Sequence, residues 1–210
     1  YPFTAGTYAT FPYKPAPRKG ISEIPGGKRA AMYSGYGSPE DTRDYYLEMR
    51  KRGQRAGPNL ALDLPTQCGY DSDNPVVRGE VGKTGVSIDT LRDFEVIYEP
   101  FRKEMNLDKI ATNWTINSAA NIFVAFYVAL AEKRGIAMDK LRATPQNDIL
   151  KEFVARGTYI FPPRPSMRMM RDSMVFFTKY CPRINVTSIG GYHIREAGAT
   201  AAQEIGFTLA

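Results

Sequence analysis

Short apolar segments alternate with helical patterns along most of this chain, and this alternation constrains the fold more than any other feature of the sequence. Segments rich in aliphatic and β-branched residues, which favour strands, lie at 60–64, 110–116, 141–144 and 184–189. Helical patterns occupy residues 38–52, 89–104, 121–134, 148–155, 166–180 and 197–209. Strands that alternate with helices favour an α/β fold with a parallel sheet.

Two of the helical segments have distinct local signals. Ser38 is a typical N-cap residue and is followed by Pro39 at the first helical position and by acids in the first turn. We therefore expect a helix that starts there and ends near Arg52. The segment 121–134 is apolar on most of its faces, which predicts a buried helix.

Polar residues stand at the ends of the predicted strands, which bears on the kind of α/β fold. They are Asp63, Asn117, Gln146-Asn147-Asp148 and Tyr192-His193. The sequence has neither a Gly-x-Gly-x-x-Gly after the first strand nor a Gly-x-x-x-x-Gly-Lys-Ser/Thr, which weakens the case for a doubly wound nucleotide-binding fold. Polar strand ends instead suit a (β/α)8 TIM-type barrel, whose active site lies at the carboxyl ends of its strands.

The number of strands indicates only part of such a barrel. Four strands are visible, and the sequence ends within an apolar helical segment, 205–210. We therefore expect residues 38–210 to form the first four β/α units, a half-barrel that is either a fragment or a subunit completed by another chain. Residues 1–37 contain several prolines that exclude a long helix and predict an extended arm: Pro12, Pro15, Pro17 and Pro25.

Composition narrows the class of protein. Hydrophobic residues make up 43% of the 210 residues and charged residues 24%, which is ordinary for a soluble globular domain. The net charge of +6 comes with no basic run that interleaves with aromatic residues, so we expect no nucleic-acid partner. Cys68 and Cys181 are far apart and lack metal-ligand spacing, which favours free thiols, no metal site and a reducing cytoplasm. No segment is long enough to span a membrane, and no signal-peptide pattern opens the sequence.

The chain contains a single histidine, His193. It follows the predicted strand 184–189 and the pair Gly190-Gly191, and it precedes a predicted helix. Catalytic side chains gather at this position in barrels, and imidazole exchanges protons near neutral pH. Its position alone leaves open whether His193 is catalytic or structural.

Three separated blocks carry a resemblance to a known family. They are Thr144-Pro145-Gln146-Asn147-Asp148-Ile149-Leu150-Lys151-Glu152, Arg156-Gly157-Thr158-Tyr159-Ile160-Phe161-Pro162-Pro163-Arg164-Pro165-Ser166-Met167-Arg168 and Gly191-Tyr192-His193-Ile194-Arg195-Glu196-Ala197-Gly198-Ala199-Thr200. Together with Gly69–Pro75 and Tyr1–Thr4, they resemble the large-subunit barrel of the methylmalonyl-CoA mutases. The resemblance covers nearly the whole chain but only the first half of the family's barrel.

The resemblance implies an isomerase that uses adenosylcobalamin. In this family a radical 1,2-migration of the thioester group interconverts methylmalonyl-CoA and succinyl-CoA. The 210 residues lack the family's Asp-x-His-x-x-Gly cobalamin signature. The resemblance therefore implies a cobalamin-binding subunit or domain as partner, besides the chain that completes the barrel and the acyl-CoA substrate.

The resemblance also implies roles for individual residues. His193 matches the histidine that hydrogen-bonds the thioester carbonyl, and Tyr33 matches the tyrosine that presses on the acyl group. Arg156 matches the arginine that pairs with the free carboxylate of a malonyl-type substrate. Gln146 matches a residue lining the substrate pocket, and Tyr192 lies beside the histidine.

Further matches lie in the arm and at the cofactor face. The arm positions that align with substrate contacts are Tyr8, Thr10 and Phe11. The positions expected to face the cofactor are Leu62, Thr84, Arg156 and His193. Between residues 14 and 31 the sequence departs from the family, so Lys28 and Arg29 are either contacts for CoA phosphates or part of a solvated loop.

Alternatives remain open at the level of function and of residues. The motifs equally suit a mutase for ethylmalonyl-CoA or another acyl-CoA, and the chain could be an inactive fragment or a non-catalytic assembly subunit. Arg156 could form a surface ion pair, Tyr33 could be a packing aromatic and Gln146 could cap the following helix.

Overall fold

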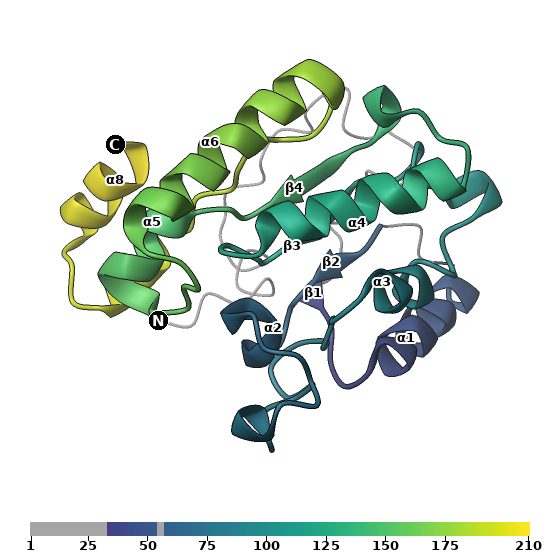
Figure 1. Cartoon of the computed structure of the whole chain (residues 1–210), viewed down its shortest axis with the longest axis horizontal. Helices are drawn as coiled ribbons and strands as arrows, with labels where there is room; N and C mark the ends of the chain where they lie inside the picture. Colours follow the sequence, from purple (N-terminus) through teal and green to yellow (C-terminus); the bar gives the residue numbers. More distant parts are fainter. Residues whose placement is uncertain (1–32, 54–56) are drawn as a thin grey trace, which may run out of the picture.

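A parallel sheet with the strand order β1-β2-β3-β4 lies in the middle of the structure (Figure 1). The computed structural model describes residues 33–53 and 57–210. The strands are short, and neighbours in the sheet follow one another in sequence: β1 Tyr33–Ser34, β2 Asn59–Leu60, β3 Thr112–Trp114 and β4 Ala143–Pro145. This confirms the α/β class and the parallel sheet, which is consistent with part of a barrel.

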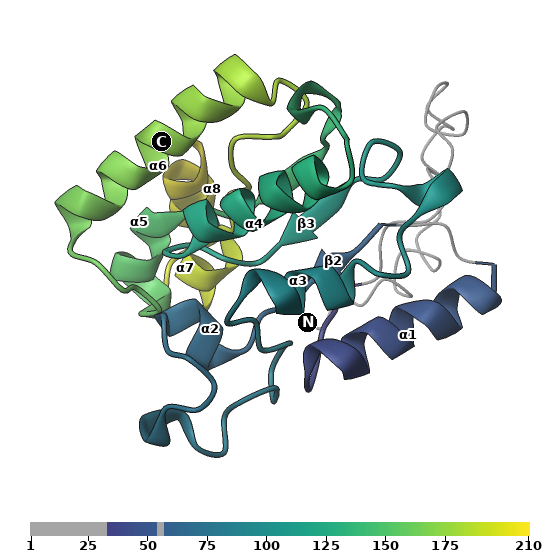
Figure 2. The ribbon, with the colours of Figure 1, turned by 45° about the vertical axis from the view of Figure 1, so that its right-hand side comes forward.

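Helices lie between and after the strands. They are α1 Pro39–Lys51, α2 Leu64–Cys68, α3 Leu91–Ile97, α4 Ala120–Lys133, α5 Ile149–Lys151, α6 Pro163–Tyr180, α7 Tyr192–Glu196 and α8 Ala201–Leu209. Short 3-10 turns are η2 Pro75–Val77, η3 Lys103–Met105 and η4 Met138–Lys140, and η5 Glu152–Arg156 is a π-helix. Helices α1, α3, α4 and α6 pack successively against one another, as Figures 1 and 2 show.

The two faces of the sheet differ in polarity because successive side chains of a strand point to opposite faces. One register row contains Leu60 and Trp114, which are 0% and 1% exposed. The other row is polar and more accessible; it consists of Tyr33, Asn59, Asn113 and Thr144. The helices therefore cover the apolar face and leave the polar face to build a site.

The predicted helices 38–52 and 121–134 are confirmed as α1 and α4. Ser38 and Asp41 form a reciprocal capping box at the start of α1, which satisfies backbone N–H groups that a helix start leaves unpaired. Tyr127 and Leu130 of α4 are 0% and 3% exposed, as an apolar core helix requires.

Several predicted boundaries are wrong, and local chemistry explains them. The helix predicted at 89–104 ends at Ile97, shortly before Pro100, which disfavours helical backbone at the preceding residue. The strand predicted at 60–64 stops at Leu60, because Asp63 caps α2 by accepting a hydrogen bond from the Thr66 backbone at 3.0 Å.

Later elements also differ from the predictions. The helix predicted at 148–155 is α5 followed by the π-helix η5, and the one predicted at 166–180 starts earlier, at Pro163. The helix predicted at 197–209 starts only at Ala201, after Gly198 at φ +111° has ended the α7 segment.

The strand prediction is wrong for two segments, both at the edges of the sheet. β1 was not predicted, since residues 33–34 lie within the predicted arm. Residues 184–189 form no regular strand, but the backbone N–H groups of Asn185 and Ser188 donate to Ala143 and Gln146 at 2.9 and 3.0 Å. This segment therefore extends along β4 and leads into α7.

Aromatic side chains form the centre of the core. Phe94 of α3 packs against five rings, at centroid distances of 4.7 to 6.3 Å: Tyr98, Trp114, Phe123, Phe126 and Tyr127. Trp114 donates its indole N–H to the Tyr98 hydroxyl at 2.9 Å, so burial leaves neither polar group unpaired. This cluster joins α3, α4 and the sheet.

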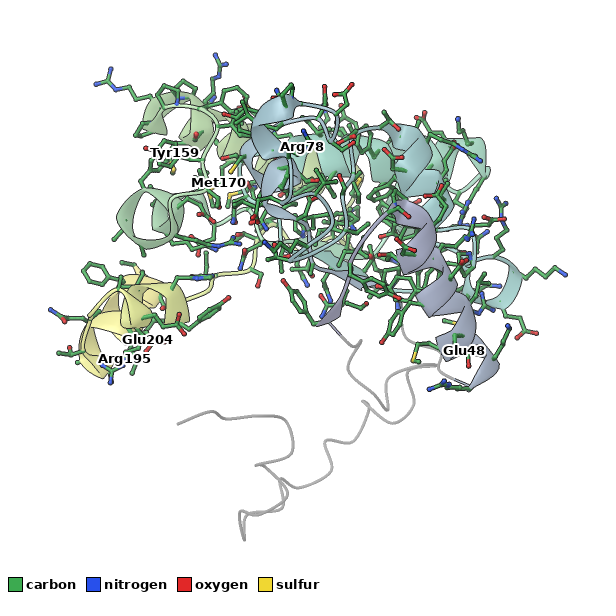
Figure 3. All side chains as sticks on the ribbon, turned by 90° about the horizontal axis from the view of Figure 1, so that it is seen from below. Glu48, Arg78, Tyr159, Met170, Arg195 and Glu204 are labelled. Carbon is green, nitrogen blue, oxygen red and sulfur yellow. The ribbon has the colours of Figure 1, made fainter. Side chains whose placement is uncertain are left out.

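Helices α7 and α8 lie away from this core. Figure 3 shows Arg195 and Glu204, on α7 and α8, at the opposite side from Glu48 of α1. Ile205, Phe207 and Leu209 of α8 are 61%, 59% and 81% exposed, so this helix presents apolar side chains to its surroundings. Within residues 33–53 and 57–210, no helix is long and apolar enough to cross a membrane.

We predict that Phe94→Ala lowers the free energy of unfolding by about 3–5 kcal/mol, the usual cost of removing a buried phenyl ring. Urea unfolding followed by circular dichroism measures the change. The control Val175→Ala alters a side chain that is 61% exposed and should shift stability by less than about 0.5 kcal/mol. Equal losses in the two variants would contradict the central role of the aromatic cluster.

Candidate functional site

Five of the residues singled out in the sequence lie at or near the carboxyl edge of the sheet. Tyr33 comes from β1, Gln146 directly follows β4, and Arg156 ends η5. Tyr192 and His193 open α7, behind the segment that extends along β4. Because parallel strands have their carboxyl ends at the same edge, residues far apart in sequence become neighbours there.

Two of these side chains form hydrogen bonds with residues just after β3. The Tyr33 hydroxyl lies 3.2 Å from the Thr115 hydroxyl, and the Tyr33 side chain is still 61% exposed. Asn117 donates its side-chain amide to Gln146 Oε1 at 3.3 Å. Gln146 therefore does not cap the next helix through this oxygen, and the Tyr33 ring is not buried as a packing aromatic would be.

Gly190 lies close to the side chains of both Gln146 and His193. Asn147 has a φ of +45°, a left-handed conformation that non-glycine residues rarely adopt and that often marks functional sites. The Gly190 backbone N–H donates to Asp148 Oδ2 at 3.1 Å. A Cβ at Gly190 would lie 3.3 Å from Gln146 Nε2 and 3.5 Å from His193 Cδ2, so both side chains pack closely around this glycine.

The surroundings of His193 favour the neutral imidazole. Its ring centroid lies 3.8 Å from that of Tyr192. Partial burial lowers the pKa of His193 from 6.5 to about 4, with the cations of Lys151 and Arg156 adding to the effect and Glu152 opposing it. At neutral pH the imidazole therefore has one N–H donor and one acceptor nitrogen. Burial also raises the pKa of the Tyr192 hydroxyl, which stays protonated.

Arg156 lies on the π-helix, a rare element that often occurs at functional sites. Its Nη1 donates to Glu152 Oε1 at 3.3 Å, and the Arg156 side chain is 26% exposed while that of Glu152 is 0% exposed. The ion pair is therefore not a surface pair, and Arg156 remains reachable from the open face of the site.

Sequence reasoning assigned no role to Lys151 and Glu152, although both lie within the quoted motifs. They are buried beside each other, with Lys151 Nζ 3.5 Å from Glu152 Oε1, and burial lowers the pKa of Lys151. The spacing of Glu152 and Arg156, four residues apart at the end of the helix predicted over 148–155, was the available signal. Burial of the pair depends on contacts that the spacing does not reveal.

Comparison with known proteins assigns the chain to a family. The model of the family described as methylmalonyl-CoA mutase matches residues 28–210. The chain is 45% identical over 179 residues to methylmalonyl-CoA mutase of Escherichia coli (strain K12), covering 85% of this chain and 24% of that protein. The chain belongs to the methylmalonyl-CoA mutase family.

Two further relatives agree with this assignment. The mitochondrial methylmalonyl-CoA mutase of Homo sapiens is 40% identical over 210 residues, covering 100% of this chain and 26% of that protein. The methylmalonyl-CoA mutase large subunit of Streptomyces virginiae is 44% identical over 179 residues, covering 85% of this chain and 24% of that protein. The chain thus spans about a quarter of the length of these mutases.

The positions expected to face a cofactor in this mutase family differ in accessibility. Arg156 and His193 are partly exposed and Thr84 is exposed, so none of the three is enclosed in the core. Leu62 is 1% exposed within the core and offers a corrin ring no side-chain surface in this structure. The arm residues expected to contact substrate lie outside the described residues: Tyr8, Thr10, Phe11, Lys28 and Arg29.

We predict that His193 stays neutral down to about pH 5, because its pKa is lowered to about 4. NMR titration of the imidazole, assigned by comparison with His193→Gln, measures this pKa. Lys151→Met removes a nearby cation and should raise the pKa towards 6.5. Lys83→Met, which removes a cation paired with Glu80 on the surface, should leave it unchanged. A wild-type pKa near 6.5 would contradict the partial burial of His193 beside the cations of Lys151 and Arg156.

Proposed function

We propose that this chain forms the acyl-binding edge of an adenosylcobalamin-dependent mutase that interconverts methylmalonyl-CoA and succinyl-CoA. The observation that supports this most is the convergence of a neutral histidine, a half-buried arginine and polar side chains at one edge of the sheet. The three sequence relatives, each named a methylmalonyl-CoA mutase, support the same reaction.

Arg156 suits the free carboxylate of a malonyl-type substrate. A guanidinium offers several N–H donors in one plane, so it can hold a carboxylate with charge-assisted hydrogen bonds. One nitrogen is bound to Glu152, and the 26% exposure of the side chain leaves a ligand access to the rest. A neutral branched acyl group would leave this charge without a substrate partner, so we infer a carboxylated acyl chain.

His193 suits the thioester carbonyl. A neutral imidazole donates one N–H, which would polarise the carbonyl while the thioester group migrates to the neighbouring carbon. Because the lowered pKa disfavours the imidazolium, we assign His193 as a hydrogen-bond donor and not as a proton source. The Tyr192 ring packs against it, and both His193 and Gln146 lie close to Gly190, so Tyr192 and Gln146 would help to orient the acyl group.

Tyr33 would press on the acyl group from β1, which lies at the other edge of the sheet from β4. Its ring is 61% exposed, and the Thr115 hydroxyl holds its phenol oxygen at 3.2 Å. Adenosylcobalamin, when bound, would supply the radical that starts the 1,2-shift. We propose that a separate cobalamin-binding module and a chain or segment that completes the barrel provide the rest of the site. The name of the Streptomyces virginiae relative, a large subunit, supports such partners.

We predict that His193→Ala lowers kcat by about 100-fold or more, the usual cost of removing one donor to a reacting carbonyl oxygen. The assay uses the full-length protein with adenosylcobalamin and its cobalamin-binding partner. CoA affinity, measured by calorimetry, should change little because the adenosine and phosphates do not contact this residue in the proposed pose. An equal loss of turnover and of CoA binding would exclude the role at the thioester.

We predict that methylmalonyl-CoA or ethylmalonyl-CoA is turned over better than isobutyryl-CoA, and that Arg156→Met removes this preference. The KM for methylmalonyl-CoA should rise about 10- to 100-fold, since a hydrogen bond to a charged group contributes about 1.5–3 kcal/mol. Arg92→Met, which alters an exposed residue of α3, serves as control. If isobutyryl-CoA is the best substrate of the wild-type protein, the role of Arg156 is wrong.

A further inference from the structure

Glu152 is the most enclosed charged group at the site. Its side chain is 0% exposed, and one carboxylate oxygen, Oε2, is anchored to the chain just beyond the π-helix. The Thr158 backbone N–H donates to this oxygen at 3.0 Å and the Thr158 hydroxyl at 2.6 Å. Burial of an ionised carboxylate requires such partners, so the position of this oxygen is fixed.

The other oxygen, Oε1, meets the groups that lead to the substrate side. Arg156 Nη1 donates to it at 3.3 Å, and the Asn117 side-chain amide donates to it as well. Lys151 Nζ approaches to 3.5 Å, which balances the charge of the carboxylate but is too long for a good hydrogen bond. One buried oxygen therefore contacts a cation from its own helix and an amide from the segment that follows β3.

Asn117 extends this contact to Gln146. Its side-chain nitrogen donates to Gln146 Oε1 at 3.3 Å as well as to Glu152, and its Oδ1 accepts the Asp148 backbone N–H at 3.0 Å. Both N–H groups of the amide are thus used, which fixes the orientation of Asn117. Gln146 and Arg156, which come from different elements, are connected to the same carboxylate.

We propose that Glu152 is a positioning residue that sets the place of the Arg156 guanidinium and, through Asn117, of the Gln146 amide. The inference rests on the proposed function, in which these two side chains hold the acyl group. A long arginine side chain loses considerable rotamer freedom when it is held, and an anchor within the protein supplies that ordering before substrate binds. Glu152 itself needs no contact with substrate.

A double-mutant cycle in the full-length mutase, assembled with its cobalamin partner, tests the inference. Glu152→Gln keeps the shape of the side chain but removes the charge that holds Arg156. We expect the KM for methylmalonyl-CoA to rise about 10-fold and kcat to change less, because substrate binding loses its preset partner. When Arg156 is already Met, adding Glu152→Gln should raise KM by only about 2- to 3-fold, the part that acts through Asn117 and Gln146, since coupled residues are not additive. Effects that multiply fully would overturn the inference.

Two controls separate positioning from folding. Leu130→Ala removes a core side chain that is 3% exposed in α4, so it should lower the melting temperature and leave KM unchanged. Glu152→Asp keeps the charge but shortens the side chain, and we expect a smaller rise in KM, about 3-fold, even if Glu152→Gln does not fold. A KM change in Leu130→Ala equal to that in the Glu152 variants would assign the effect to general destabilisation and overturn the inference.

A crystal structure of Glu152→Asp distinguishes failure of this inference from failure of the proposed function. We expect the Arg156 guanidinium and the Gln146 amide to be displaced or to lose defined density. Unmoved side chains would overturn the positioning role. If Arg156→Met alone leaves the KM for methylmalonyl-CoA unchanged, the proposed carboxylate contact fails, while displacement of Arg156 in the crystal would still support Glu152 as its anchor.

Discussion

The parallel pairing of the strands is the constraint on which the rest of the structure depends. In register, Tyr33 pairs with Asn59, Asn59 with Asn113 and Asn113 with Thr144, so the polar residues of one face align in a row. The same pairing places every carboxyl strand end at one edge, where the loops that follow must meet. The aromatic cluster around Phe94 holds the opposite face against the helices. The site therefore exists because the core on the other face fixes the register.

Buried charge then determines the chemistry at that edge. Lys151 and Glu152 are 1% and 0% exposed in their side chains, and such ions are tolerated only when they compensate each other. Partial burial disfavours protonation of His193, and the same cations that Glu152 balances add to this effect, which leaves a neutral imidazole beside them. One carboxylate thereby connects the charge of the site, the place of Arg156 and the orientation of Asn117. The Glu152 carboxylate therefore contributes to both the geometry and the electrostatics of this edge.

Local signals predicted those elements whose stabilising contacts are close in sequence. The cap at Ser38 and the apolar pattern of 121–134 gave α1 and α4 because caps and helical periodicity act within a few residues. β1 escaped prediction because a two-residue strand has no periodicity of its own and forms only by pairing with Asn59–Leu60. Residues 184–189 were predicted as a strand, yet they make only scattered backbone hydrogen bonds to the chain near β4. In both cases, backbone hydrogen bonding to residues distant in sequence determined whether a regular strand formed.

By itself, the sequence determined the α/β class, the family and the identity of the candidate residues, because apolar spacing and motif blocks are local properties of the chain. The tertiary structure decided the protonation state, the burial and the contacts of these residues. The neutral state of His193, the burial of the Arg156–Glu152 pair and the link from Glu152 through Asn117 to Gln146 all depend on side chains from different elements. Desolvation and hydrogen bonding are set by what surrounds a group in space, and residue order along the chain does not specify those surroundings.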